Sequence, residues 1–162
     1  MPPMQVRALG ALDLGEAARL HGLGFAPFGE RTWTRQEIAE LLASPGVRGC
    51  LLEGEKGVAG FVLWRVAVDE AELLTIAVHP DERRRGGGRV LLEAAIEAAR
   101  DAGAIAMLLE VGEDNQAARG LYDRRGFSTV GRRPAYYQRG ANPKADAVIM
   151  RLVLDSSVKR AG

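Results

Sequence analysis

Apolar and polar positions along the second half of the chain predict a strand, a helix and another strand. Residues 72–78 form a strand-like segment, and residues 88–102 carry apolar side chains at helical spacing. The nearly continuous apolar run 105–111 follows and is typical of a strand buried on both faces. A strand, a helix and a strand in this order predict a right-handed crossover and a parallel pair of strands.

The first half predicts further strands and two helices. Asp13 is expected to cap a helix that Gly22 and Gly24 break, and Thr34 with Glu37 has the spacing of a capping box at the start of a second helix. Strands are expected at 6–9, 48–53 and 58–68, the last two joined by turn residues 54–57.

Toward the C-terminus, Asp114 is expected to cap a helix that runs through Tyr122 and closes at Gly126. Two last strands are expected around 127–130 and 146–154. The fold class is therefore α/β (α+β), with a central mixed, mostly antiparallel sheet of about six to seven strands and about four flanking helices. A single domain is expected over residues 1–154, followed by a frayed tail at 155–162.

Composition narrows the class of protein. The 162 residues are 47% hydrophobic and 27% charged, which is typical of a soluble globular domain. No apolar run reaches the roughly 20 residues that cross a bilayer, and the start of the chain lacks an apolar signal core. The single cysteine, Cys50, forms no internal disulfide and suits a reducing compartment. A cytoplasmic protein without membrane contact is expected.

The net charge of +1 hides an uneven distribution. Residues 1–82 carry 7 basic and 12 acidic side chains, whereas residues 83–162 carry 15 basic and 9 acidic side chains. A protein that coats nucleic acid is usually basic overall, so direct nucleic-acid binding is not expected. A basic second half suits a small polyanion, and an acidic first half suits a cationic substrate. An uneven surface without function remains the alternative.

The segment Arg83–Gly88 reads Arg-Arg-Arg-Gly-Gly-Gly and lies between an expected strand and an expected helix. Glycines allow backbone N–H groups to approach an anion, and the helix N-terminus adds a favourable dipole. Arginine forks match phosphate oxygens. This placement favours phosphate binding over a solvated surface turn. Leu91 stands where a dinucleotide fingerprint needs glycine, and the chain has no P-loop sequence.

The residues around this loop resemble the GNAT superfamily of acetyl-CoA-dependent N-acetyltransferases. Arg83, Gly86 and Gly88 match its Gln/Arg-x-x-Gly-x-Gly/Ala loop. Within the superfamily, nearly the whole chain resembles the bacterial ribosomal-protein-alanine N-acetyltransferases. The other matching residues are Leu109-Glu110-Val111, Asn115, Ala118, Leu121-Tyr122, Gly126-Phe127, Arg132-Arg133, Tyr136-Tyr137 and Asp146-Ala147.

The resemblance implies acetyl-CoA as the co-substrate and no metal. It assigns the CoA pyrophosphate to the backbone of the glycine-arginine loop, and the acetyl group and pantetheine arm to the backbone of the preceding strand. Asn115 is expected to cap a helix, to bind the pantetheine amide, or both. The complete set of expected cofactor-binding residues is Ile76, Ala77, Val78, Arg83, Arg84, Arg85, Gly86, Gly87, Gly88, Arg89 and Asn115.

Two residues are expected to carry the chemistry. Glu110 interrupts the apolar run at its end, and the resemblance makes it the base that accepts the amine proton, directly or through water. Its alternative role is a structural acid paired with an arginine. The resemblance makes Tyr122 the acid that protonates the leaving thiolate, whereas a tyrosine on a helix is more often a packing residue. Tyr136 and Tyr137 either wall the amine site or belong to the core.

The expected function is acetylation of a protein N-terminal α-amine, with the N-terminal alanine of a small-subunit ribosomal protein as acceptor and a monomer or weak dimer as the assembly. Acetylation of a small-molecule amine or lysine, and acyl-CoA binding without turnover, remain alternatives. The chain departs from the family pattern at Gly87, where a larger apolar residue is common, at His79, which replaces a frequent Asp, and at Ala135, which replaces a frequent Asn. His21 is expected to be a surface or core residue.

Overall fold

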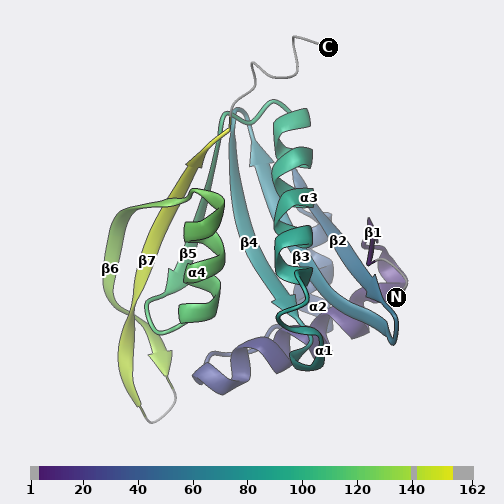
Figure 1. The fold of residues 1–162 in the computed structure, drawn as a ribbon, viewed down its shortest axis with the longest axis horizontal. Helices are drawn as coiled ribbons and strands as arrows, with labels where there is room; N and C mark the ends of the chain where they lie inside the picture. The colour runs from purple at the N-terminus through teal and green to yellow at the C-terminus, as the bar shows by residue number, and fades with distance from the viewer. Residues whose placement is uncertain (1–3, 140–141, 155–162) are drawn as a thin grey trace.

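The computed structural model describes residues 4–139 and 142–154, and Figure 1 shows the arrangement of its helices and strands. The tail expected at 155–162 lies outside these residues. The elements in chain order are β1 (Gln5–Ala8), α1 (Leu14–Phe25), α2 (Arg35–Ala43), β2 (Val47–Gly54), β3 (Gly57–Ala67), β4 (Glu70–Val78), α3 (Gly87–Asp101), β5 (Ala106–Gly112), α4 (Gln116–Arg125), β6 (Ser128–Arg139) and β7 (Asn142–Val153).

The strands form one sheet with the order β1-β2-β3-β4-β5-β7-β6. Among the described strands, β4 and β5 are the parallel pair, and the other neighbours are antiparallel. Seven strands and four α-helices in the described residues confirm the fold class expected from the sequence. The parallel pair predicted from the strand–helix–strand order is confirmed as well, with α3 as the crossover helix.

Both faces of the sheet are covered by helices (Figure 1). Along β3, Phe61 and Leu63 pack on the face covered by α1 and α2, whereas Val62 and Trp64 pack on the face covered by α3. This alternation follows the two-residue period of a strand. The central strands are therefore buried on both faces, and α3 is held against them by apolar side chains that include Leu91, Leu92 and Ile96.

The parallel strands β4 and β5 stay paired over a short distance only. Their register covers Glu70–Glu72 of β4 and Ala106–Leu108 of β5, and beyond these residues the two strands diverge. The remainder of β4, from Leu73 to Val78, keeps β3 as its neighbour on the other side. Peptide groups along the diverging edges are thus left for partners other than a strand. The opening between the two edges is where the expected site residues gather.

Local signals in the sequence were read correctly at several helix ends. The Thr34 hydroxyl accepts the Glu37 N–H at 3.1 Å, and the Glu37 carboxylate accepts the Thr34 N–H at 3.2 Å, so the predicted capping box is present. Gly126 closes α4 with a φ of 105°. Such left-handed geometry is readily adopted by glycine at a helix end.

Three expectations about the elements were wrong. Helix α1 runs through Gly22 and Gly24 to Phe25, because its apolar face packs against β3 and β4, where Leu20 shares a buried cluster with Phe61 and Ala77. The cap of α4 is Asn115 and not Asp114: the Asn115 Oδ1 accepts the Ala118 N–H at 3.3 Å, which confirms the capping role expected of Asn115. The last two strands form a hairpin much longer than the expected segments, because bulges in β6 let pairing continue past Val130.

Candidate active site

Two adjoining cavities occupy the opening between β4 and β5. One, of about 550 Å³, lies beside the glycine-arginine loop and is called the loop cavity. The other, of about 420 Å³, contains Glu110 in its lining and is called the Glu110 cavity. Phe25, Ile76, Asn115 and Ala118 line both cavities. The two cavities therefore form one continuous cleft with two chemically different ends.

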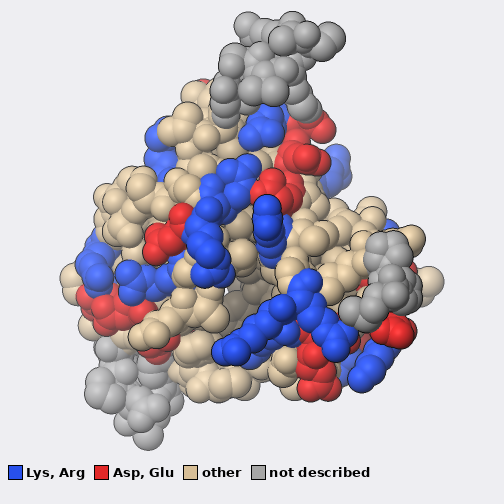
Figure 2. Space-filling view, viewed as in Figure 1, with Lys and Arg blue, Asp and Glu red and all other residues tan. Residues whose placement is uncertain are grey.

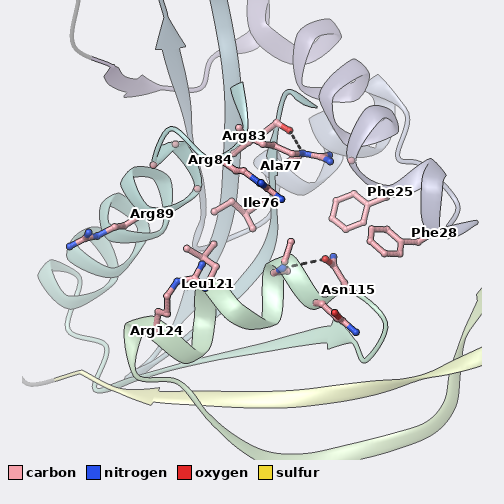
Figure 3. Close-up of a pocket in the computed structure, with 18 residues that line it drawn as sticks. Phe25, Phe28, Ile76, Ala77, Arg83, Arg84, Arg89, Asn115, Leu121 and Arg124 are labelled. Carbon is pink, nitrogen blue, oxygen red and sulfur yellow. Dashed lines mark hydrogen bonds between the residues drawn. The ribbon is translucent and has the colours of Figure 1, made fainter. Parts of the chain in front are cut away.

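The loop between β4 and α3 shapes one end of the cleft (Figure 3). Gly86, the residue before α3, has a φ of 83°, and a Cβ there would meet no protein atom within 4 Å. Gly87 is packed tightly, since its Cβ would lie 2.8 Å from Leu52 Cδ2. The small residue at 87 thus lets the helix start close to β2. The first turn of α3 directs backbone N–H groups that have no intrahelical acceptor toward this end of the cleft.

Arginines of the loop cavity have a distinctive electrostatic setting. Arg84, Arg89 and Arg124 line the cavity, and within the described residues none of them forms an ion pair with a carboxylate. Figure 2 shows Lys and Arg side chains on both sides of the central hollow. Unneutralised guanidinium groups from a loop and two helices create a positive field that suits a polyanion. The expected anion site therefore combines open space in front of Gly86 with arginine side chains that no carboxylate of the described residues neutralises.

The other expected cofactor residues are placed around the same cavity. Ile76, Ala77 and Val78 line it with the edge of β4, and Arg83 donates to the Val78 carbonyl at 3.4 Å. Gly88 and Asn115 complete its wall. Arg85 differs from the rest: it pairs with the buried Glu82 at 3.5 Å and is not among the residues that line the cavity.

Glu110 and Tyr122 both line the Glu110 cavity. The Glu110 side chain is 29% exposed, and its Oε1 lies 3.0 Å from an Arg133 guanidinium nitrogen of β6. Tyr122 is buried, with its ring 5.7 Å from that of Phe127, and Tyr136 lines the same cavity. The arginine pairing expected under the structural alternative for Glu110 is thus present, and so is its access to the cavity. The side chain of Tyr137 lies outside the described part of the chain.

His21 joins α1 to the segment that precedes α2. Its Nδ1 accepts the Trp33 N–H at 3.1 Å, and its ring stacks on the Trp33 ring with centroids 4.5 Å apart. Burial, followed by the nearby Arg31, lowers the pKa of His21 to about 4. The imidazole is therefore neutral near pH 7 and carries its proton on Nε2. The expectation of a core residue is correct, and this core residue also lines the Glu110 cavity.

Sequence reasoning missed several lining residues. Phe25 and Phe28 face the loop cavity from the end of α1 and the turn after it (Figure 3), and Arg124 reaches it from α4. Apolar and basic residues of this kind are common on any helix, so single residues gave no signal. The charge excess of the second half was the one indication, because it foreshadowed a basic cleft.

No helix among the described residues is long and apolar enough to cross a membrane. No group of three or more histidine, cysteine, aspartate or glutamate side chains in them is arranged to hold a metal ion.

Comparison with known proteins yields consistent matches. The model of the acetyltransferase (GNAT) family matches residues 16–127. The [ribosomal protein bS18]-alanine N-acetyltransferase of Salmonella typhimurium is 42% identical over 101 residues, which are 62% of this chain and 68% of that protein. The N-alpha-acetyltransferase RimI of Mycobacterium tuberculosis is 36% identical over 155 residues, 92% of each chain. The crystal structure of the Escherichia coli ribosomal-protein-S18-alanine N-acetyltransferase aligns with a TM-score of 0.84 and 31% identity, covering 94% of this chain and 95% of that one.

Proposed function

The chain belongs to the acetyltransferase (GNAT) family, and we propose that it transfers an acetyl group from acetyl-CoA to the N-terminal α-amine of a protein. The observation that carries this proposal is the continuous cleft, which has a basic, glycine-rich end and an end that contains Glu110 and Tyr122. The acetyltransferase domain spans residues 1–154 in this proposal, and the reaction takes place in the cytoplasm.

The loop cavity is the proposed site of the CoA moiety. CoA is a polyanion, and the free charges of Arg84, Arg89 and Arg124 suit its phosphates. The space in front of Gly86 allows close approach of a pyrophosphate to the backbone at the start of α3. Peptide groups of Ile76–Val78 on the open edge of β4 are proposed to pair with the amide groups of the pantetheine arm. Asn115 lines both cavities, and its side-chain amide is proposed to hydrogen-bond the same arm.

At the other end, Glu110 and Tyr122 are proposed to move protons. As the amine nitrogen bonds to the acetyl carbon and the carbon–sulfur bond breaks, Glu110 accepts a proton from the amine, directly or through water. The Tyr122 hydroxyl gives a proton to the departing thiolate. Arg133 orients the Glu110 carboxylate, since its guanidinium lies 3.0 Å from Oε1. Glu110 on β5 thus serves the attacking amine nitrogen, and Tyr122 on α4 serves the departing sulfur.

The proposed acceptor is the N-terminal alanine of a small-subunit ribosomal protein. The similar Salmonella and Escherichia proteins are N-acetyltransferases for an alanine of ribosomal protein bS18 or S18. An α-amine has a pKa near ~8 and a lysine amine near ~10.4, so the α-amine is far more often neutral at physiological pH. A site whose only proposed proton acceptor is a carboxylate therefore favours the α-amine, which loses its proton more readily than lysine does.

The test is acetylation of two peptides across a pH series. One peptide has a free N-terminal alanine, and the other is blocked at its N-terminus and carries a lysine. We expect the free alanine peptide to be acetylated faster at neutral pH. Mass spectrometry of the products locates the acetyl group. Preference for the blocked lysine peptide would overturn the N-terminal assignment, and the absence of transfer to either would overturn the proposed function.

Glu110→Gln tests the proposed base in the same assay. The amide keeps the shape but accepts no proton, so the rate should fall roughly 100-fold at low pH and the deficit should shrink above the amine pKa of ~8. Glu72→Gln is the control, because Glu72 lies on the exposed side of β4 near Arg65. A deficit independent of pH would make Glu110 a structural acid.

A further inference from the structure

Strand β6 contains a strained bulge beside the Glu110 cavity. Arg133 pairs with Ala147 of β7, and Tyr137 pairs with Ala145, so four steps along β6 span two steps along β7. Ala135 within this bulge has a φ of 49°. Left-handed geometry is unfavourable for alanine and persists only where the surroundings enforce it. Among residues with a side chain, asparagine tolerates this geometry far better than alanine does.

The enforcing contact comes from Asp146 on β7. Its Oδ1 accepts the Ala135 N–H at 2.7 Å, and its Oδ2 lies 3.2 Å from an Arg132 guanidinium nitrogen. Arg132 also binds Glu113 at 2.9 Å, and the Glu113 N–H donates to the Asp146 carbonyl at 3.0 Å. Asp146 is thus fixed by its own neighbours and in turn fixes the bulge.

The bulge carries two side chains to the acceptor end of the cleft. Arg133 at its start reaches Glu110 at 3.0 Å, and the guanidinium carbon of Arg133 lies 5.3 Å from the centre of the Tyr136 ring. Tyr136 itself lines the Glu110 cavity. A regular strand at this point would place the Tyr136 side chain differently, because Tyr136 lies among the residues inserted between the pairs Arg133–Ala147 and Tyr137–Ala145.

We propose that Asp146 is a positioning residue for the acceptor: by holding Ala135 in its strained conformation, it sets Tyr136 at the Glu110 cavity, beside Arg133. This inference rests on the proposed function, since it concerns the acceptor of that reaction. It predicts an effect on the acceptor and none on acetyl-CoA, because the lining of the loop cavity contains no residue of the bulge.

The experiment compares Asp146→Ala, Asp146→Asn and the double variant Asp146→Ala with Ala135→Gly. Loss of the clamp in Asp146→Ala should lower kcat/KM for the alanine peptide roughly 5- to 30-fold, which corresponds to the typical cost of one such strained residue. Asp146→Asn retains an oxygen for the Ala135 N–H and should stay close to wild type. The double variant should recover most of the lost rate, because glycine adopts the left-handed geometry without strain.

Asp13→Ala is the matched control. Asp13 likewise accepts a backbone N–H, from Gly10 at 2.8 Å, and binds an arginine, Arg7, at 2.9 Å, but it lies near β1 and outside both cavities. It should lower stability without changing kcat/KM for the peptide. Calorimetry should give the same acetyl-CoA affinity for all variants. A wild-type rate for Asp146→Ala, a parallel loss of acetyl-CoA affinity, or no recovery in the double variant would each overturn the proposal.

Hydrogen exchange supplies a readout that needs no acceptor. Peptides that cover the β6 bulge should exchange faster in Asp146→Ala than in wild type, and Asp146→Asn should restore protection. If the wild type acetylates neither peptide, the proposed function fails, whereas unchanged exchange in Asp146→Ala overturns the clamp itself. The two failures are therefore distinguishable.

Discussion

The two ends of the cleft are built in opposite ways. At the loop cavity, one contiguous segment from Ile76 to Arg89 supplies half of the lining residues, and Arg84 and Arg89 have no carboxylate partner among the described residues. At the Glu110 cavity, the lining comes from α1, the segment before α2, β4, β5, α4 and β6. Two polar groups at this end are held by neighbours from other segments, as in the pairs Glu110–Arg133 and His21–Trp33.

The two constructions suit two different tasks, binding a polyanion and placing a specific amine. Binding a polyanion needs backbone N–H groups and uncompensated positive charge, which one loop at a helix start can supply. Receiving a specific amine needs several side chains held in fixed relation, which requires contacts between distant segments. Changes at the loop cavity should therefore alter acetyl-CoA affinity, and changes at the Glu110 cavity should alter turnover.

The largest expected effect is on turnover, in Tyr122→Phe. Removal of the hydroxyl should lower kcat by on the order of 10²–10⁴, because a positioned acid acts on the thiolate that develops only as the reaction proceeds. Acetyl-CoA affinity, measured by calorimetry, should stay nearly the same. Steady-state kinetics on the alanine peptide checks the rate, and a wild-type rate would make Tyr122 a packing residue of the core.

At the opposite end, Gly86→Val should weaken acetyl-CoA binding by roughly 10- to 100-fold, since each charge-assisted hydrogen bond lost is worth about 1.5–3 kcal/mol. Gly103→Val is the control: Gly103 follows α3, has a φ of 96°, and its Cβ would also meet nothing within 4 Å. Both variants carry similar backbone strain, and Gly86 alone lines the cleft. Equal acetyl-CoA affinity of the two folded variants, measured by calorimetry, would contradict phosphate binding at the loop.

The smallest of these effects concerns stability: protonation of His21 is expected to destabilise the folded protein. Its pKa of about 4 in the folded protein lies below its ordinary 6.5, because the ring is buried. As the pH falls, the unfolded chain therefore takes up the proton first. The contribution of His21 to the free energy of unfolding should be fully present above pH 6.5 and should be lost as the pH drops toward 4. The expected loss in free energy of unfolding is about 2–3 kcal/mol.

Urea denaturation at pH 7, 6 and 5 measures this loss. In His21→Gln the free energy of unfolding should depend less on pH over the same range. The window above pH 5 isolates the histidine, since hydrogen bonds hold the pKa values of Asp13 and Glu37 below their ordinary 3.8 and 4.5. A slope of equal size in the variant would assign the effect to other groups.

Features encoded within a few neighbouring residues could be predicted from the sequence. The capping box of Thr34 and Glu37 and the glycine-arginine loop are of this kind, because their partners lie three to five residues apart. The parallel pairing of β4 and β5 was also predictable, since chain order and the handedness of crossovers leave few choices.

Features that depend on distant contacts could not be predicted. Gly22 and Gly24 indicate a helix end when taken alone, yet α1 continues because its face packs against β3 and β4. Phe25 reaches the cleft only because of that continuation. The β6 bulge depends on Asp146, eleven residues from Ala135 along the chain, and no local pattern marks the strained alanine. The acceptor end is therefore where sequence reasoning was least informative.

The divergence of β4 and β5 also determines which partners can reach the open edge of β4. A strand edge with unpaired peptide groups is a template on which another chain can polymerise. Here the open edge of β4 lies in a recess whose walls include Phe25 of α1, Gly88 of α3 and Leu121 of α4, rather than at the rim of the sheet. A slender ligand can enter such a recess, whereas a strand flanked by its own sheet is too broad. The protein can thus keep hydrogen-bonding backbone available for binding without exposing it to aggregation.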